Sequence, residues 1–308
     1  MGRYVLRRLL DLIPVFFGTT LLMYWLVWVM PGAPFAGKCG DRACPQGYID
    51  KMTAKYHLDE PLPVQYAHYM ADLLRGDFGE TYGGRQVADI IVAAAPATAK
   101  LALVAILFEA VIGIAAGVLS GLRRNGFVDN VILVSTLFML AVPIFVSAGA
   151  LRHLFGVEWR LIDPTVSAGA PLHQLLLPGF LLASLSMAAV ARLTRGSIAE
   201  IERADYVRTA HAKGLPRRRV VGVHMLRNSL LPVVTFLGLD LGGLMSGSVI
   251  IEGIFQINGL GAEFYRGVVT KEGATVVGLT VVVMLAYLIL NLLVDLLYAS
   301  LDPRIRLA

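Results

Sequence analysis

Charged residues are scarce in this sequence, and their scarcity excludes an ordinary soluble protein. Only 16% of the 308 residues are Asp, Glu, Lys or Arg, while 56% are hydrophobic. Soluble domains carry about 25% charged residues. The chain also lacks the G-x-x-x-x-G-K-[ST] loop that cradles nucleotide phosphates. Its six histidines are scattered, without metal-ligand spacing or a Ser-His-Asp context. We therefore predict no nucleotide site, no metal site and no catalytic residue in this chain.

The sequence also contains few cysteines. Cys39 and Cys44 are the only two cysteines, and four residues separate them. On the oxidising side of a membrane such a pair can close a small disulfide loop, and two free thiols are the alternative. Metal binding by the pair is not expected, because no third or fourth ligand lies nearby in the sequence.

Long hydrophobic runs, by contrast, are abundant. A helix needs about 20 apolar residues to cross the hydrocarbon core of a bilayer, and six runs are long enough to do so. The first run follows three arginines but is too long for a signal peptide, so we expect it to remain as an anchor. The sequence thus predicts an all-α integral membrane protein with one transmembrane domain, residues 1–308. Its six predicted membrane helices are 9–30, 101–122, 128–151, 172–193, 230–251 and 274–297.

The basic residues predict the orientation, because they are retained near the cytoplasmic ends of membrane helices. Clusters of arginine or lysine precede the first run, follow the second and fill the segment between the fourth and fifth. We therefore expect both termini in the cytoplasm, a long extracytoplasmic loop at 31–96 and a cytoplasmic loop at 194–229. This topology and anionic membrane lipid explain the net charge of +5, so we predict no nucleic-acid partner.

The long outer loop contains two candidate amphipathic helices, at 48–56 and 64–74. In the second, one helical face is predicted to be apolar. That face could rest on the membrane surface, or it could dock an extracytoplasmic partner. The residues on it are Val64, Ala67, Met70, Ala71 and Leu74.

The loop between the fourth and fifth runs has the pattern of two short helices. Residues 198–213 contain no Gly or Pro, and Gly214, Leu215 and Pro216 then form a stop signal. A second helical stretch begins at Arg217 and leads into the fifth run. Small residues in this loop would allow close approach by a partner. A basic loop that only binds lipid is the simpler alternative.

The same loop carries a resemblance to a known family. Its sequence, DYVRTAHAKGLPRRRVVGVHMLRNSLLP, resembles the coupling loop of ABC importer permeases, and most closely the dipeptide and oligopeptide permeases, in which YVRTA, AKG and LRN recur at this spacing. It departs from the general importer pattern at Arg208, Thr209, His224 and Arg227, as the peptide subfamily does. Further similar segments are RYVLRRLLDLIPVFFGTTLLMYWLVWVMPGAP, HLDEPLPVQY, LLRGDFGETY, IEGIFQINGLG and NLLVDLLYASLDPRIR, so the resemblance spans nearly the whole chain.

The resemblance implies an architecture and a set of partners. It implies the type I ABC importer permease fold and a first-type permease subunit, multi-pass in a bacterial cell membrane. The implied partners are a second homologous permease, two ABC ATPases and an extracytoplasmic peptide-binding protein. ATP and Mg would be bound by the ATPases, and this chain would be non-catalytic and hold no cofactor. The implied ATPase-docking residues are Asp205, Tyr206, Arg208, Thr209, Ala210, Ala212, Lys213, Gly214 and Leu226.

Ionisable residues inside the membrane mark either a pathway or a paired structural site, because their burial is costly. Asp240 lies among glycines that form small-xxx-small patterns, so it either lines the peptide path or makes a packing hydrogen bond. Glu109 has the same two interpretations, with Lys100 as a candidate partner. Asp11 and Asp295 lie near the cytoplasmic boundary, where we expect solvation or pairing with arginine.

Two prolines are predicted to disturb membrane helices. Pro143 and Pro178 lie within predicted membrane helices, where each would remove a backbone hydrogen bond and kink its helix.

The same architecture could import nickel, haem or an oligosaccharide. A nickel carrier should show many His or Met residues on its outer face, and this loop has few. A secondary transporter is a further alternative, but the broken helices and paired repeats of that class are not evident.

Overall fold

The computed structural model describes residues 2–29 and 44–301. Helices make up almost all of it, and one β-bridge between Glu80 and Gln86 is the extended pairing in the described ranges. In chain order the elements are α1 (Gly2–Tyr24), η1 (Trp25–Val29), α3 (Gln46–Lys55), α4 (Leu62–Leu74), α5 (Val87–Phe108), η2 (Glu109–Gly113), α6 (Ile114–Leu122), α7 (Phe127–Ala141), α8 (Ile144–Arg152), η3 (His153–Glu158), α9 (Leu176–Ile201), α10 (Asp205–Ala212), α11 (Arg217–Arg219), η4 (Val220–Met225), α12 (Leu226–Ser229), α13 (Leu231–Phe255), α14 (Leu260–Val269) and α15 (Gly273–Leu301), where η marks a π-helical turn.

The prediction of six membrane spans is confirmed, although two of the spans are bent. Four continuous helices are long and apolar enough to cross a membrane: Leu6–Trp28, Val87–Leu122, Leu176–Ile201 and Gly273–Leu296. Two further spans arise if each bent helix pair counts as one. Phe127–Ala141 and Ile144–Glu158 meet at 97°, and Arg217–Ser229 and Leu231–Ser246 meet at 48°.

The helix of the second span begins well before residue 101, within the predicted outer segment 31–96. α5 starts at Val87 and continues through Pro96 to Phe108. Asp89 and a run of alanines lower the local hydropathy, which hid this part of the helix from the sequence pattern. Tertiary packing nevertheless favours it, because Val87, Ile90 and Ala94 are buried.

The two prolines behave differently. Pro143 follows the end of α7 in an extended conformation, and a new helix starts directly after it, so the predicted kink is confirmed as a break. Pro178 lies in the first turn of α9, where a missing backbone N–H leaves no helical hydrogen bond unmade. The predicted kink at Pro178 was therefore wrong.

Glycines allow the helices at the centre of the molecule to pack closely. A Cβ atom added to Gly117 of α6 would lie 2.5 Å from the Ala191 carbonyl oxygen of α9. The predicted small-residue patterns of α13 pack on α15, because a Cβ on Gly238 or on Gly242 would lie 2.5 Å from a side-chain atom of Val294 or Tyr287. These contacts fit the small-xxx-small mode of helix packing in membranes.

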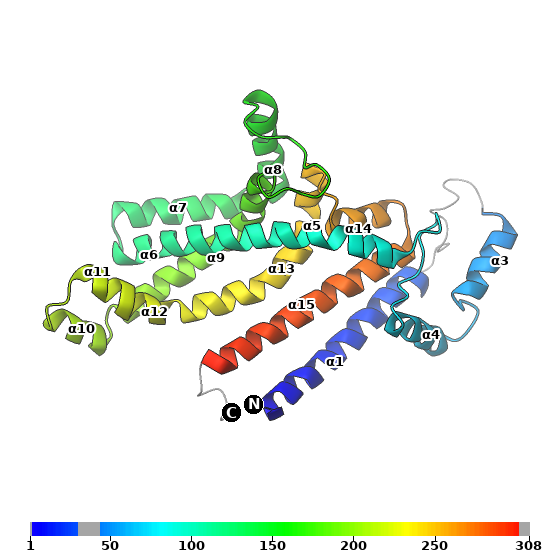
Figure 1. Ribbon diagram of the computed structural model, residues 1–308, viewed down its shortest axis with the longest axis horizontal. Coiled ribbons are helices and arrows are strands. Elements are labelled where there is room, and N and C mark those ends of the chain that lie inside the picture. The colour runs from blue at the N-terminus through cyan, green and yellow to red at the C-terminus, as the bar shows by residue number, and fades with distance from the viewer. Residues whose placement is uncertain (1, 30–43, 302–308) are drawn as a thin grey trace.

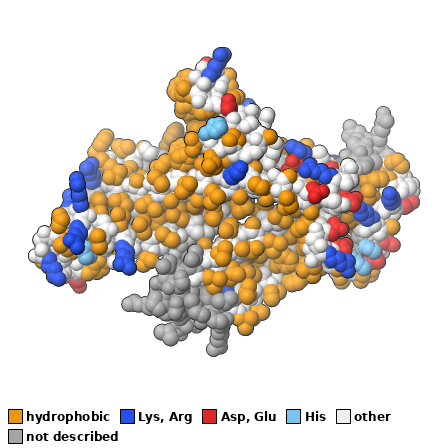
Figure 2. Space-filling model, in the orientation of Figure 1, with side chains coloured by type: hydrophobic (Ala, Val, Ile, Leu, Met, Phe, Trp, Pro, Cys, Tyr) orange, Lys and Arg blue, Asp and Glu red, His pale blue; other side chains and the backbone are white. Residues whose placement is uncertain are grey.

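The long helices separate two polar ends of the molecule. α10, α11 and α12 lie at one end, whereas α3 and α4 lie at the other (Figure 1). Between the two ends the surface is mainly hydrophobic (Figure 2). α1 and α15 run side by side, and Arg8 of α1 pairs with Asp295 of α15 at 3.2 Å, as the expected arginine pairing requires.

Candidate functional site

The loop predicted to dock an ATPase folds as a small packed unit, which we call the knob (residues 205–229). Its interior is apolar and continuous with the end of α9. Val207 and Ala210 of α10 pack with Val220 and Met225 of the following segment and with Ile198 of α9. The knob is therefore attached to the membrane helices through a shared core, and the two cannot move independently without exposing apolar surface.

The turn inside the knob follows the sequence prediction. α10 ends at Ala212, and Gly214 adopts a left-handed backbone with φ +72°, which glycine tolerates at no steric cost. The Gly214 N–H donates to the His211 carbonyl at 2.9 Å, and Pro216 precedes the next helix. The continuous helix expected at 198–213 was wrong, because turns at 202–204 separate α9 from α10.

The predicted docking residues divide into an exposed group and a buried group. Asp205, Tyr206, Arg208, Thr209, Ala212, Lys213 and Gly214 are exposed to solvent. Ala210 is only 4% exposed, and Leu226 packs against the knob interior. The expectation that Ala210 offers close approach to a partner was wrong, since its side chain faces the core. We call the exposed group the docking face.

Internal contacts hold the docking face in place. The Asn228 Nδ2 of α12 donates to the Tyr206 hydroxyl of α10 at 3.0 Å. The Thr209 hydroxyl donates to the Asp205 carbonyl oxygen at 2.9 Å, and Arg208 lies 3.6 Å from the Asp205 carboxylate. The two halves of the knob are thus joined by a side-chain hydrogen bond as well as by the apolar core.

An ion pair that the sequence reasoning missed connects the spans near the knob. Both nitrogens Nε and Nη2 of Arg195 in α9 donate to the Asp129 carboxylate of α7 at 2.7 Å. The Ser120 hydroxyl of α6 and the Asn125 backbone N–H also donate to this carboxylate. Three helices therefore meet at one buried acid. A charge within a predicted membrane run was the available signal, but the partner lies far away in the chain.

The two predicted pathway carboxylates lie together. Glu109 occupies the π-helical turn η2 and is fully buried, and it lies close enough to Asp240 of α13 for the two carboxyl groups to interact electrostatically. Neither Glu109 carboxylate oxygen has a hydrogen-bond donor among the described residues. Lys100, the candidate partner, donates instead to the Gly169 carbonyl oxygen at 2.8 Å. π-helical turns frequently occur at functional sites.

A second buried carboxylate was also missed, and it has a structural function. Glu252 near the end of α13 is fully buried. Its carboxylate accepts hydrogen bonds from the Thr98 and Ser248 hydroxyls at 2.7 and 2.8 Å and from the Ala262 backbone N–H at 2.9 Å. Ala262 lies in the first turn of α14, so this carboxylate satisfies an N–H at a helix start.

The outer end of the molecule contains α3 and α4, which confirms both predicted short helices. Val64, Ala67 and Leu74 of the predicted apolar face of α4 are exposed, as a membrane-facing or docking surface requires, and which of these two functions the face has stays a prediction. Met70 of that face is instead buried with Leu73, in a cluster with side chains of α1 and α15. Cys39 lies outside the described residues, so its disulfide with Cys44 stays a prediction.

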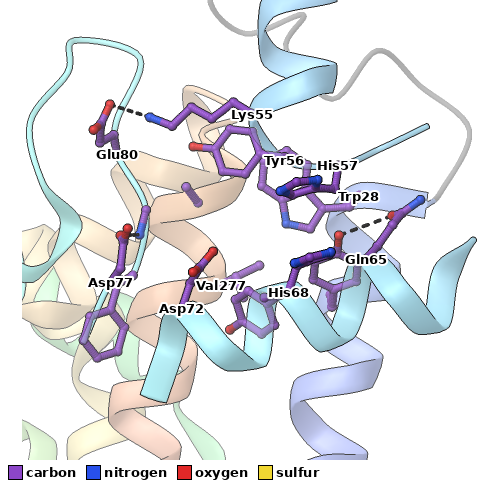
Figure 3. A pocket seen from close by; sticks show the side chains of 15 residues that line it. Trp28, Lys55, Tyr56, His57, Gln65, His68, Asp72, Asp77, Glu80 and Val277 are labelled. Atoms are coloured by element: carbon purple, nitrogen blue, oxygen red, sulfur yellow. Dashed lines mark hydrogen bonds and ion pairs between the residues drawn. The ribbon is translucent and has the colours of Figure 1, made fainter. Parts of the chain in front are cut away.

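A pocket lined by aromatic and charged side chains lies between α4, η1 and the segment before α5 (Figure 3). Trp28 and Tyr56 stack there with ring centroids 4.7 Å apart. Lys55 bridges to Glu80 at 2.8 Å, and this hydrogen bond and ion pair hold the pKa of the Glu80 carboxyl below its usual range. The ion pair fastens α3 to the segment that precedes α5.

Comparison with known proteins places these features in a family. The family described as binding-protein-dependent transport system inner membrane component matches residues 113–307, and its N-terminal membrane component matches residues 1–102. The chain is 35% identical to the oligopeptide transport system permease protein OppB of Salmonella typhimurium over 308 residues, which cover 99% of this chain and 100% of that protein. It is 36% identical to the dipeptide transport system permease protein DppB of Bacillus subtilis over 309 residues, covering 100% of this chain and 99% of the relative.

Proposed function

The chain belongs to the family of binding-protein-dependent transport system inner membrane components, and we propose that it is the permease subunit of an ABC importer for dipeptides or oligopeptides. The similarity extends over the full length of both relatives, so it includes the membrane spans as well as the knob. Peptide is favoured over nickel, haem or an oligosaccharide, because both kinds of relative carry peptide transport in their names.

The permease works with partner chains. Membership of this family implies ATPase and binding-protein subunits in general. We propose that the complete complex has a second homologous permease, two ABC ATPases and an extracytoplasmic peptide-binding protein. ATP and Mg²⁺ are then bound by the ATPases, and this chain supplies the path and the docking face.

The proposed orientation puts the knob in the cytoplasm. Lys and Arg side chains gather at the end of the molecule that holds α10 to α12, whereas both signs of charge mix at the opposite end (Figure 2). Basic residues are retained on the cytoplasmic side of membrane proteins. The start of α1 and the end of α15 would then also be cytoplasmic, and α3 and α4 would face the binding protein.

The observation that carries the coupling proposal is the position of the docking face. It lies on a knob that follows α9 directly and leads through η4 and α12 into α13, with a 48° bend at the entry. Movement of the knob by ATPase closure would tilt these two spans as rigid levers. Alternating access to the two sides of the membrane is the expected result of such a two-state element.

The experiment that tests this proposal places a bulky side chain on the docking face. Ala212→Trp should lower peptide-stimulated ATP hydrolysis and peptide uptake in proteoliposomes by about tenfold, the effect of losing about 1.4 kcal/mol of docking free energy. Val223→Trp is the matched control, because Val223 is 55% exposed on η4 and is not a predicted docking residue. Normal uptake by the Ala212→Trp complex would refute the coupling role.

A further inference from the structure

Three potential metal ligands meet at the junction of α3 and α4, outside the knob and the membrane spans. The donor atoms of His57, Glu60 and His68 all lie within 4.8 Å of one another. His57 Nδ1 is 3.3 Å from Glu60 Oε1, and His68 Nε2 is 3.3 Å from Glu60 Oε2. The two imidazole rings stack with centroids 4.2 Å apart (Figure 3). Each ligand thus presents an atom to one common volume.

The local backbone holds these ligands in position. His57 follows the end of α3 in a left-handed conformation with φ +54°, which is uncommon for a residue other than glycine. Pro61 then precedes α4, which carries His68. Strained backbone of this kind occurs often at functional sites, where the surrounding structure supports it.

A buried glutamine holds the backbone of Glu60 in place. The Gln65 side-chain amide donates to the Glu60 carbonyl oxygen at 2.6 Å, and its oxygen accepts from the Tyr24 hydroxyl at 3.3 Å. The backbone of Glu60 is therefore tied to α1. The Oε2 atom of the Glu60 carboxylate is buried, and the imidazole of His68 lies 3.3 Å from it without making a hydrogen bond.

We propose that His57, Glu60 and His68 bind one divalent transition-metal ion of the Zn²⁺ class. Two imidazole nitrogens and one carboxylate oxygen are a common ligand set for zinc, with a further position open to water. Ca²⁺ and Mg²⁺ are disfavoured, because they prefer oxygen ligands alone. The imidazole side chains are 43% and 46% exposed, so an ion can reach them from solvent, and binding it requires the stacked rings to turn their nitrogens toward one point.

The bound ion joins α3 to α4 at the mouth of the aromatic pocket. Lys55 of α3 lines the same pocket as His57 and His68, and its charge is already paired with Glu80. The site lies at the opposite end of the molecule from the knob (Figure 1). Its occupancy is therefore a property of the outer surface, and it is independent of the proposed docking to ATPases.

The test uses the full-length chain in its complex, with an affinity tag that contains no histidine, in lipid nanodiscs stripped of metal. Titration with ZnCl₂ should show one site per chain, and Co²⁺ should give the visible absorption of a four-coordinate site. His68→Ala and His57→Asn should each weaken Zn²⁺ binding by at least about tenfold. His57→Asn is chosen because Asn tolerates a left-handed backbone, so folding is preserved.

Two control variants separate this site from other donors. His153 lies 3.3 Å from Glu158 in a two-donor pair, and His153→Ala should leave Zn²⁺ binding unchanged. A Cys39→Ser/Cys44→Ser double variant should also keep the site. Absence of Zn²⁺ binding by the wild-type complex would overturn the proposal. So would binding that survives both His57→Asn and His68→Ala, or that disappears in the cysteine variant.

Discussion

Arg195 of α9 binds Asp129 of α7 through two parallel hydrogen bonds, each 2.7 Å long. The Asp129 side chain is 1% exposed and that of Arg195 is 22% exposed, so the pair is largely removed from water. α9 leads directly into the knob. The pair therefore holds α9 against α7 in the part of the protein that would transmit movement from the docking face into the membrane.

Breaking this pair from one side should be costly. Asp129→Ala leaves a guanidinium without its partner, and we expect a loss of about 3–5 kcal/mol in unfolding free energy. The double variant Asp129→Ala/Arg195→Leu should regain part of this loss, because it removes both charges. Thermal unfolding of the purified complex measures both of these variants and the single variant Arg195→Leu. Additive losses in the double variant would show that the two residues do not interact.

Close packing of α6 on α9 gives a second prediction. Gly117→Ala should destabilise the protein by about 1–3 kcal/mol, because the new methyl group meets the Ala191 carbonyl oxygen and must push the helices apart. Gly196→Ala, on α9, is the matched control, since a Cβ there has no neighbour within 4 Å. Its melting temperature should equal or exceed that of the wild type. Equal melting temperatures for both variants would contradict the packing argument.

The proximity of the carboxyl groups of Glu109 and Asp240 gives a third prediction. Glu109→Gln replaces a carboxylate without a donor by an amide whose NH₂ can donate to Asp240, so we expect stability to be kept or raised. If the pair lines the peptide path, uptake should fall while peptide-stimulated ATP hydrolysis persists. Proteoliposome uptake and thermal unfolding, measured on the same preparation, separate the two effects. Unaltered uptake would assign the pair to packing alone.

The carboxylate of Glu252 should contribute more to the unfolding free energy than the carboxylate of Glu263 on α14. Glu252→Gln places an NH₂ group against hydroxyl and N–H donors, and we expect a loss of about 1–3 kcal/mol. Glu263→Gln is the control, because Glu263 pairs with Arg266 of the same helix, whose side chain is 61% exposed, and ion pairs that reach water contribute about 0–1 kcal/mol. Equal stability of the two variants in thermal unfolding would argue against the buried network.

The Lys55–Glu80 pair predicts a pH effect at the outer end of the molecule. The pKa of Glu80 is lowered by its hydrogen bond to Lys55, so the folded state binds this proton less readily than the unfolded state. The resulting stabilisation is present above the unfolded pKa and is lost as pH falls through the folded pKa. Hydrogen exchange in residues 79–86 should therefore speed up in acid after correction for intrinsic rates. Glu80→Gln should remove this dependence.

Local chemistry was enough to predict the main elements. The six spans follow from runs of apolar residues, and the end of α10 follows from Gly214 and Pro216. The docking residues come from the family resemblance alone, and their function stays a prediction. The sequence pattern did not show which side chains of α4 pack on the rest of the protein: Met70 and Leu73 are buried against α1 and α15, whereas Val64 and Leu74 stay exposed.

The sequence by itself determined that the chain enters a membrane, because the transfer free energy of an apolar run depends on its own residues and on little else. It also determined the family, through motifs that are contiguous in the chain. The tertiary structure alone decided which polar groups meet: Asp129 with Arg195, Glu109 with Asp240, and His57 with Glu60 and His68. Hydrogen bonds and ion pairs form only within about 3–4 Å. Separations that short between residues far apart in the chain are set by how the helices pack.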